Sequence, residues 1–439
     1  MKRILIVVLL VCLVVGSINA AGTTETAAGG KKVVRMWTFL NPEGATSGRN
    51  LALKKIIENF ESQHPDIDIV VEPQQWDVMT NKFFAAHQAG NAPDVMWVIS
   101  YDLGSAIEQG MLADLESLFL NNWSTQEIQD IDDSFFRWGE TNGKHYQITH
   151  SRNYFALIYR KDLIEKFNIQ FPFKSWDAMV QAAQKMTGID QTTGIMRYGL
   201  GQSFGLGKVD PPIFTYDALT HQEDIFNADG TANWTTPQMV SAVSRMSDMV
   251  KKFKVTPEEA VNFDIEDVYQ DFMAGKYAMI TGASVRVPAL RAGANFDPNS
   301  IEIIHYPGDG STPFGTGLFS GWAVSVWSKS KVIDEAGMFL EYMMSPEADK
   351  LWVLDGGQVP IRKSTITSMK DFFEKPENEY LKITAEGFAD YCYATPTAFP
   401  IPSWREDLNA VAQDVIYNNT APRAALEKMQ NEFNARVGK

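Results

Sequence analysis

The feature that most constrains the fold is an alternation of strand-like and helix-like segments between Phe60 and Leu115. An amphipathic helix and a strand come first, a second helix ends at Gly90, a strand runs from Pro93 through Val98, and a further helix ends at Gly110. Short connections between alternating strands and helices are typical of a parallel sheet covered by helices. The sequence therefore predicts an α/β fold.

The length and composition of the chain predict a large globular protein. With 439 residues it is longer than a single hydrophobic core usually organises, so we expect two lobes. Hydrophobic residues make up 45% of the chain and charged residues 21%, which is ordinary for a globular protein. The net charge of −15 argues against nucleic acid or an anionic membrane surface as the main partner.

The first 20 residues predict an export signal. Lys2 and Arg3 precede an apolar run from Ile4 to Val15, which is shorter than the roughly 20 residues that span a bilayer, and small residues suited to cleavage follow it. Residues 21–32 are rich in Gly, Ala and Thr, so we expect a flexible leader there. We therefore expect the protein in the periplasm or at the extracellular face of the membrane.

The two cysteines predict neither a disulfide nor a lipid tether. Cys12 lies within the apolar run, with Val11 before it in place of the small residue of a lipidation motif. Cleavage leaves Cys392 as the one cysteine of the mature chain, and we expect it to pack as a small apolar side chain.

Several phrases resemble the extracellular solute-binding proteins of ABC importers, in particular the cluster that binds sugars and oligosaccharides. They follow one another with the family's spacing and cover nearly all of the mature chain. In order they are the PDIDIV strand, AHQAGNAPDV, GMLADL, LIYRKD, WDAMVQAAQKM, VYQDFMAGKYAMITGASVRVPA, FSGWAVS, EAGMFLEYMM followed by SPE, GGQVPIR, and a closing helix at 423–437.

The resemblance implies a two-lobed periplasmic-binding-protein fold of type II. Each lobe would be a mainly parallel sheet flanked by helices, with three crossings between the lobes, near Thr149, at Tyr277–Thr281 and at Phe319–Ser325. We expect the N-terminal lobe to comprise 33–148 plus 283–323, and the C-terminal lobe 149–282 plus 324–439.

The resemblance also implies a function without chemistry. The protein would capture a mono- or oligosaccharide in the cleft between the lobes and deliver it to the transmembrane subunits of an ABC permease. We expect a monomer with no cofactor, no metal and no catalytic residue.

Candidate ligand contacts follow from what a sugar requires. Aromatic rings cover its C–H faces, and polar side chains satisfy its hydroxyls. In the first lobe, loops at the carboxyl ends of strands are where an α/β sheet places ligand contacts, and the candidates there are Trp37, Asn41, Glu43, Trp76 and Tyr101. Alternatives stay open, since Asn41 could simply begin a turn and Trp37 could pack inward.

Further candidates lie in the second lobe and at the crossings: Arg152, Tyr216, Ser284, Arg286, Trp322 and Trp404. We expect affinity to fall when Tyr216 or Trp404 is replaced by alanine. The segment from Gly282 to Arg286 departs from the family, because it lacks the tryptophan that many sugar binders carry after the equivalent glycine. Arg286 there suggests a more polar contact.

Two other kinds of function remain as alternatives. Arg152 and Arg286 would each need an anionic partner, either a protein carboxylate or an acidic solute such as a glycerol phosphate, a uronate or a metal complex. A carbohydrate-active enzyme would need two carboxylates about 5–10 Å apart, for which Glu43 and Asp102 could be nominated, although nothing in their local sequence singles them out.

Motifs for other chemistry are weak. The six histidines form no HExxH motif. The glycine-rich stretch 199–208 continues with Val209, where a phosphate loop would carry Ser or Thr. The acidic run 129–133 is typical of a solvated helix face rather than a calcium site.

Overall fold

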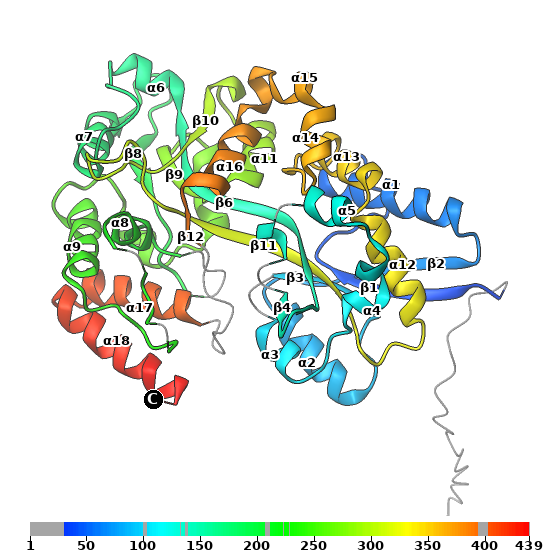
Figure 1. The fold of residues 1–439 in the computed structure, drawn as a ribbon. Helices are drawn as coiled ribbons and strands as arrows, with labels where there is room; N and C mark the ends of the chain where they lie inside the picture. The colour runs from blue at the N-terminus through cyan, green and yellow to red at the C-terminus, as the bar shows by residue number, and fades with distance from the viewer. Residues whose placement is uncertain are drawn as a thin grey trace, which may run out of the picture.

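The computed structural model describes residues 30–99, 103–131, 133–136, 139–206, 211–222, 224–227, 229–393 and 403–438. They form two α/β lobes that lie side by side (Figure 1). Two long strands, β6 (Ile148–Arg160) and β11 (Gly317–Val326), run through the middle of the molecule and join the lobes. The expected two-lobed α/β fold is confirmed.

The first lobe contains three parallel strands in the order β2-β1-β3, and β11 pairs antiparallel with β3 at one side of them. Its strands are β1 (Lys32–Thr38), β2 (Ile67–Pro73), β3 (Val95–Ile99) and the short pair β4 (Glu140–Thr141) and β5 (Lys144–His145). Its helices are α1 (Gly48–Gln63), α2 (Met79–Ala89), α3 (Gly104–Glu108), α4 (Leu115–Leu118), α5 (Thr125–Asp130), α12 (Ile333–Met343) and α13 (Pro346–Leu354), with 3-10 turns at Leu120–Asn122 and Asp133–Phe135.

The first-lobe elements form where the apolar pattern predicts them. All five residues of β3 (VMWVI) are buried, as expected for a central strand with helices on both faces. The buried residues of α1 recur three and four positions apart, which places one apolar face against the sheet. Asp114 accepts hydrogen bonds from the first N–H groups of α4, which fixes where that helix begins.

The second lobe has a mixed sheet. Its strands are β7 (Gly188–Ile189), β8 (Met196–Gly201), β9 (Tyr277–Ala283), β10 (Ile301–Ile304) and β12 (Cys392–Tyr393). Its helices are α6 (Lys161–Lys166), α7 (Trp176–Met186), α8 (Ile213–His221), α9 (Pro237–Lys251), α10 (Ile265–Met273), α11 (Val287–Gly293), α15 (Lys370–Phe373), α16 (Glu379–Asp390), α17 (Trp404–Tyr417) and α18 (Pro422–Val437), with 3-10 turns at Glu258–Val261, Ser284–Arg286, Pro298–Ser300 and Pro376–Asn378. Helix α14 (Lys363–Ser368) lies in the connection between the lobes and contacts α13 and α15.

Strand pairing in the second lobe is less parallel than we expected. β8 and β9 are parallel, but β6 pairs antiparallel with both β9 and β10. The reason is that β6 enters this lobe from the first lobe, in the direction opposite to β9. Helix α7 begins where its N-cap predicts, because the Ser175 hydroxyl accepts a hydrogen bond from the Ala178 N–H.

Buried side chains divide the chain differently from the expected lobe ranges. One cluster joins residues from 34–148 with Trp322 and with residues up to Ile361. Two others join residues 154–318 with Val359 and with residues of helices α16, α17 and α18. Residues 283–318 thus pack with the second lobe, and 324–354 with the first. On this packing we propose a first lobe of 33–148 plus 322–361 and a second of 154–318 plus 370–438.

The positions of the crossings differ from the expectation at one strand. The strand at Tyr277–Thr281 does not cross between lobes, because β9 lies inside the second lobe between β8 and β6 and is buried on both faces. The connections run along β6, along β11, and from α13 of the first lobe to α16 of the second. An apolar strand at a hinge and one within a core have similar sequences, so the pattern alone did not separate them.

The described residues contain neither a membrane-spanning helix nor a cluster of metal ligands. No helix there is both long and apolar enough to cross a membrane. In the same part of the chain, no three His, Cys, Asp or Glu side chains gather closely enough to hold a metal ion.

Candidate functional site

A cavity of about 300 Å³ lies between the lobes, beside the crossing strands. Both lobes and the crossing strands contribute described side chains to its wall: Phe39, Arg49, Trp76, Ile99, Asn153, Phe155, Ile265, Glu266, Tyr269, Ala283, Val285, Arg286, Trp322 and Arg405. Its volume is at the lower end of the range of about 300–1,000 Å³ that is usual for small-molecule sites.

The first-lobe wall is aromatic. Phe39 follows the carboxyl end of β1, and its ring centroid lies 4.1 Å from that of Trp322 on β11, with the planes tilted by 44°. Trp76 lies between β2 and α2 and is half-buried. These rings come from the edge of the sheet where its parallel strands end, which is where α/β folds place ligands.

The second-lobe wall is built at the start of α10 and the end of β9. The Tyr269 hydroxyl accepts a hydrogen bond of 3.0 Å from the Ala283 N–H, which ties α10 to β9. Gly282 allows this close approach, because a Cβ there would lie 3.0 Å from the Tyr269 ring. Glu266 and Arg286 are thereby brought together as an ion pair, and the Arg286 guanidinium lies 4.9 Å from the Tyr269 ring centroid.

Strand β6 contributes an amide to the cavity. Asn153 is only 8% exposed, and its Oδ1 has no hydrogen-bond partner in the described part of the chain. A buried amide oxygen without a partner is costly, so Asn153 is suited to a ligand that brings a hydroxyl to donate to it.

Arg49, the second residue of α1, adds a positive charge to the cavity wall and is half-buried. Its guanidinium lies 4.8 Å from the Phe39 ring centroid, and no carboxylate of the described residues lies within ion-pair distance of it. Burial, together with the charge of Arg286, lowers the pKa of Arg49 to about 10. Arg49 stays charged at neutral pH, but in surroundings that disfavour the charge.

Three of the predicted contacts line the cavity: Trp76, Arg286 and Trp322. Ser284 lies beside it without lining it, because its hydroxyl is buried and accepts a hydrogen bond from the Tyr154 N–H at 3.3 Å. Arg152 lies on β6 opposite Gly321 of β11, and its side chain is outside the described part of the structure. Tyr101 also lies outside the described residues.

Three first-lobe candidates lie elsewhere. The Trp37 indole N–H donates to Glu72 at 2.7 Å, and the ring packs against the first-lobe core. Asn41 and Glu43 line a different cavity of about 510 Å³, beside α1 and β2. There the Asn41 side chain accepts a hydrogen bond of 3.1 Å from the Glu43 N–H, which is the turn that the sequence left open as the alternative.

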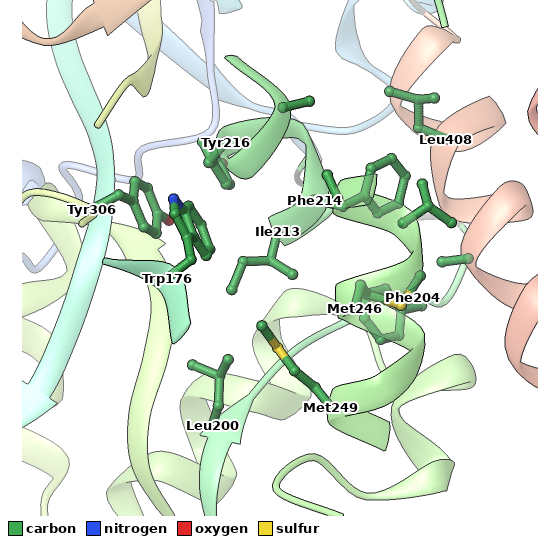
Figure 2. Close-up of a cluster of buried hydrophobic side chains, with 14 of the residues drawn as sticks. Trp176, Leu200, Phe204, Ile213, Phe214, Tyr216, Met246, Met249, Tyr306 and Leu408 are labelled. Carbon is green, nitrogen blue, oxygen red and sulfur yellow. The ribbon is translucent and has the colours of Figure 1, made fainter. Parts of the chain in front are cut away.

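Tyr216 and Trp404 belong to the core of the second lobe, which corrects our expectation that they contact the ligand. Tyr216 is fully buried, with its ring centroid 4.6 Å from that of Tyr306 and nearly parallel to it; Trp176 stacks in turn on Tyr306 at 5.7 Å (Figure 2). Trp404 is 3% exposed and meets Phe226 edge-on at 5.9 Å. Residues of α8 from Ile213 to Leu219 are all buried, so this part of the helix presents no exposed side chain to a ligand.

Sequence reasoning missed much of the cavity wall, notably Phe39, Arg49, Asn153, Glu266, Tyr269 and Arg405. Phe39 precedes the loop that we singled out, and Arg405 is the neighbour of Trp404, so in both cases the prediction was close along the chain. Arg49 had one usable signal, its place at the start of a helix that follows the first strand.

A larger cavity of about 590 Å³ lies among α14, α15 and α16. All of its lining residues come from 359–385. Because a ligand there would contact a single segment of the chain, this cavity gives no means of coupling binding to movement of the lobes.

Two α/β lobes, joined through long strands around a cavity to which both contribute, define a two-lobed solute-binding protein. The chain belongs to the bacterial extracellular solute-binding protein family, whose model matches residues 55–379. The resemblance drawn from the sequence phrases is thereby confirmed.

The individual relatives have low sequence identity to this chain, but the matches cover most of its length. The Escherichia coli (strain K12) protein YcjN, which is named as an ABC transporter periplasmic-binding protein, is 22% identical over 330 residues, covering 73% of this chain and 72% of that protein. The ABC substrate-binding protein Lmo0181 from Listeria monocytogenes, in complex with cycloalternan, has a TM-score of 0.76 at 21% identity, covering 92% of this chain and 99% of that one.

A third relative gives the same result. An ABC transporter solute-binding protein from Thermotoga lettingae, bound with alpha-D-tagatose, has a TM-score of 0.76 at 22% identity, covering 92% of this chain and 99% of that one. At this level of identity the structural likeness establishes the fold.

Proposed function

We propose that this protein is the substrate-binding component of an ABC importer, which captures a carbohydrate in the cavity between its lobes and delivers it to a membrane permease. The observation that carries the proposal is that one cavity is lined from both lobes, by Phe39 and Trp76 on one side and Tyr269 and Arg286 on the other.

A ligand in this position can couple binding to the relative arrangement of the two lobes. If it contacts both walls, it binds the closed arrangement of the lobes more tightly than the open one, and so shifts the population toward the closed form. A permease that recognises both lobe surfaces can then distinguish the loaded protein from the empty one.

The wall chemistry supports a carbohydrate. The rings of Phe39, Trp76 and Trp322 offer apolar surface to C–H groups, while Asn153 and Glu266 offer hydrogen bonds to hydroxyls. The complexes of related folds with cycloalternan and with alpha-D-tagatose support the same ligand class.

We infer binding without turnover. Glycoside hydrolysis commonly uses two opposed carboxyl groups, whereas Glu266 is the one carboxylate among the described lining residues and is paired with Arg286. Glu43, nominated as half of a catalytic pair, lines the other cavity beside α1 and β2. The family and the related folds are binding proteins, which favours the same conclusion.

We also propose that the protein is exported, with residues 1–20 removed, and acts as a monomer without a lipid tether. Membership of an extracellular family supports export. The apolar run after Lys2 and Arg3 supports cleavage rather than anchoring.

The experiment is a thermal-shift screen of the mature protein against mono- and oligosaccharides, followed by calorimetry on the best ligand. A ligand that binds only the folded state raises the melting temperature by mass action. We expect one-to-one binding, and chromatography should return the sugar unchanged. Release of a smaller sugar would support the enzyme, and absence of any shift across the panel would contradict the proposal.

A further inference from the structure

The described lining of the cavity holds more cationic than anionic side chains, although the whole protein is acidic. The chain carries a net charge of −15, yet the described lining contains Arg49, Arg286 and Arg405 against the single carboxylate of Glu266. Neutral sugars need hydrogen-bonding groups, but they do not need an excess of cations.

Arg49 is the cation that the protein itself leaves unbalanced. Arg286 has Glu266 as its ion partner, whereas Arg49 contacts the face of Phe39 and has no carboxylate partner among the described residues. Arg49 is half-buried, and partial removal of a guanidinium from water is unfavourable unless an anion meets it. The depressed pKa of Arg49 agrees with that cost.

The surroundings of Arg49 define the rest of the ligand. Phe39 and Trp322 form an aromatic surface next to the guanidinium. Asn153, nine-tenths buried in the same cavity, has an amide oxygen without a partner in the described part of the chain, so it can bond to a hydroxyl. The volume of about 300 Å³ favours a ligand of one or two sugar rings.

We propose that the natural ligand is an acidic carbohydrate, with its carboxylate or phosphate bound by Arg49, its apolar face on Phe39 and Trp322, and a hydroxyl on Asn153. This inference rests on the proposed function and narrows it to a substrate class. Arginine suits the role, because its planar fork donates two parallel hydrogen bonds to an oxyanion.

The test uses matched pairs of probes that differ by the anionic group. We would compare D-glucose with D-glucuronate, D-galactose with D-galacturonate, and D-glucose with its phosphate ester, in the wild type and in Arg49→Gln. The fluorescence of Trp76 and Trp322 in the cavity wall reports occupancy, and calorimetry gives the affinity. The carboxylate and phosphate arms distinguish the two sources of anion.

We expect at least one acidic member to bind about 10-fold or more tightly than its neutral partner, and Arg49→Gln to remove most of that difference. Arg49→Lys should keep part of it, because the charge remains while the fork is lost. The control Arg423→Gln, on exposed α18, should change neither affinity.

The possible results are distinguishable. Neutral sugars that bind as well as or better than their acidic partners would overturn this inference and leave the proposed function intact. An acid preference that survives in Arg49→Gln would overturn the role of Arg49. If no carbohydrate binds, acidic or neutral, both the inference and the proposed function are contradicted.

Discussion

Arg286 and Glu266 form an ion pair in the wall of the cavity, although they lie on separate elements, one after β9 and the other in the first turn of α10. Each side chain is about one-third exposed, 33% for Arg286 and 32% for Glu266, so the pair faces the space that a ligand would occupy. The negative charge of Glu266 therefore reduces the attraction of Arg286 for an anionic ligand.

Replacing Glu266 by glutamine should therefore increase the preference for acidic ligands. The substitution keeps the size of the side chain and removes the one carboxylate of the described wall. We expect the affinity for an acidic sugar, relative to its neutral partner, to rise about 3- to 10-fold, since a nearby like charge disfavours an anion. Calorimetry on one matched pair of sugars measures this ratio, and an unchanged or lower ratio would contradict the charge assignment.

Trp76→Ala should weaken carbohydrate binding without unfolding the protein. Trp76 is half-buried at the cavity and packs at the edge of the first-lobe core. Loss of its ring should reduce affinity about tenfold, while the melting temperature of the empty protein changes little. The matched control is Tyr417→Ala, which removes an exposed ring on α17 outside this cavity. Equal affinities for Trp76→Ala and the wild type would remove Trp76 from the site.

Tyr216→Ala should instead destabilise the fold. The side chain is fully buried against Tyr306, and deleting a large aromatic group from a core costs about 3–5 kcal/mol of unfolding free energy. Trp404→Ala should act in the same way, because its ring packs against Phe226. Urea unfolding of the empty proteins measures the cost. A variant that keeps wild-type stability but loses affinity for the sugar would show that the replaced residue contacts the ligand, contrary to this prediction.

His150 should make the first lobe sensitive to acid. Its ring is buried between Trp97 and Trp352, at centroid distances of 5.4 and 5.0 Å, and burial lowers its pKa to about 4. Between about pH 4 and the ordinary histidine pKa of about 6.5, the imidazole of His150 is protonated in the unfolded chain but stays neutral in the folded protein. The full unfolding free energy is therefore present above about pH 6.5. As the pH falls from there toward about 4, His150 lowers the unfolding free energy by up to about 3 kcal/mol.

The measurement is urea unfolding of the wild type and of His150→Gln at pH 7 and pH 5. The wild type should lose more stability than the variant on acidification. Asp349, whose pKa burial raises to about 6, acts in the opposite direction in this range. It is present in both proteins, so the difference between them isolates His150. Parallel losses would show that His150 does not titrate in this way.

The sequence predicted the architecture well because apolar periodicity specifies elements locally. The buried strand β3 and helix α7 lie where their patterns placed them. Trp76, Arg286 and Trp322 were predicted because strand ends and crossings can be located along the chain, and all three line the cavity. Order along the chain does not show which segments pack in which lobe, so the lobe ranges that we propose from packing differ from the sequence expectation for residues 283–318.

The other residues of the cavity wall could not be predicted from the sequence, because which residues line the cavity depends on the direction of each side chain in the folded protein. At the start of α17, Trp404 points into the core and Arg405 lines the cavity, although they are adjacent in sequence. Tyr216 looked suitable for a sugar because it is aromatic and polar at once, but the packing of α8 buries it. Arg49 is a candidate ligand contact because of its position beside Phe39 and Arg286, and only the folded chain brings these residues near it.

The central claim, that a ligand is held between two lobes, is tested most directly by measuring a distance across the cleft. Spin labels on Gln88→Cys of α2 and Lys428→Cys of α18, both exposed positions, would be placed in a chain carrying Cys392→Ser. Pulsed electron paramagnetic resonance then gives the distance distribution between the lobes with and without a sugar that binds. We predict that saturating sugar narrows the distribution and shifts it to a shorter distance. An unchanged distribution with the ligand fully bound would contradict the account.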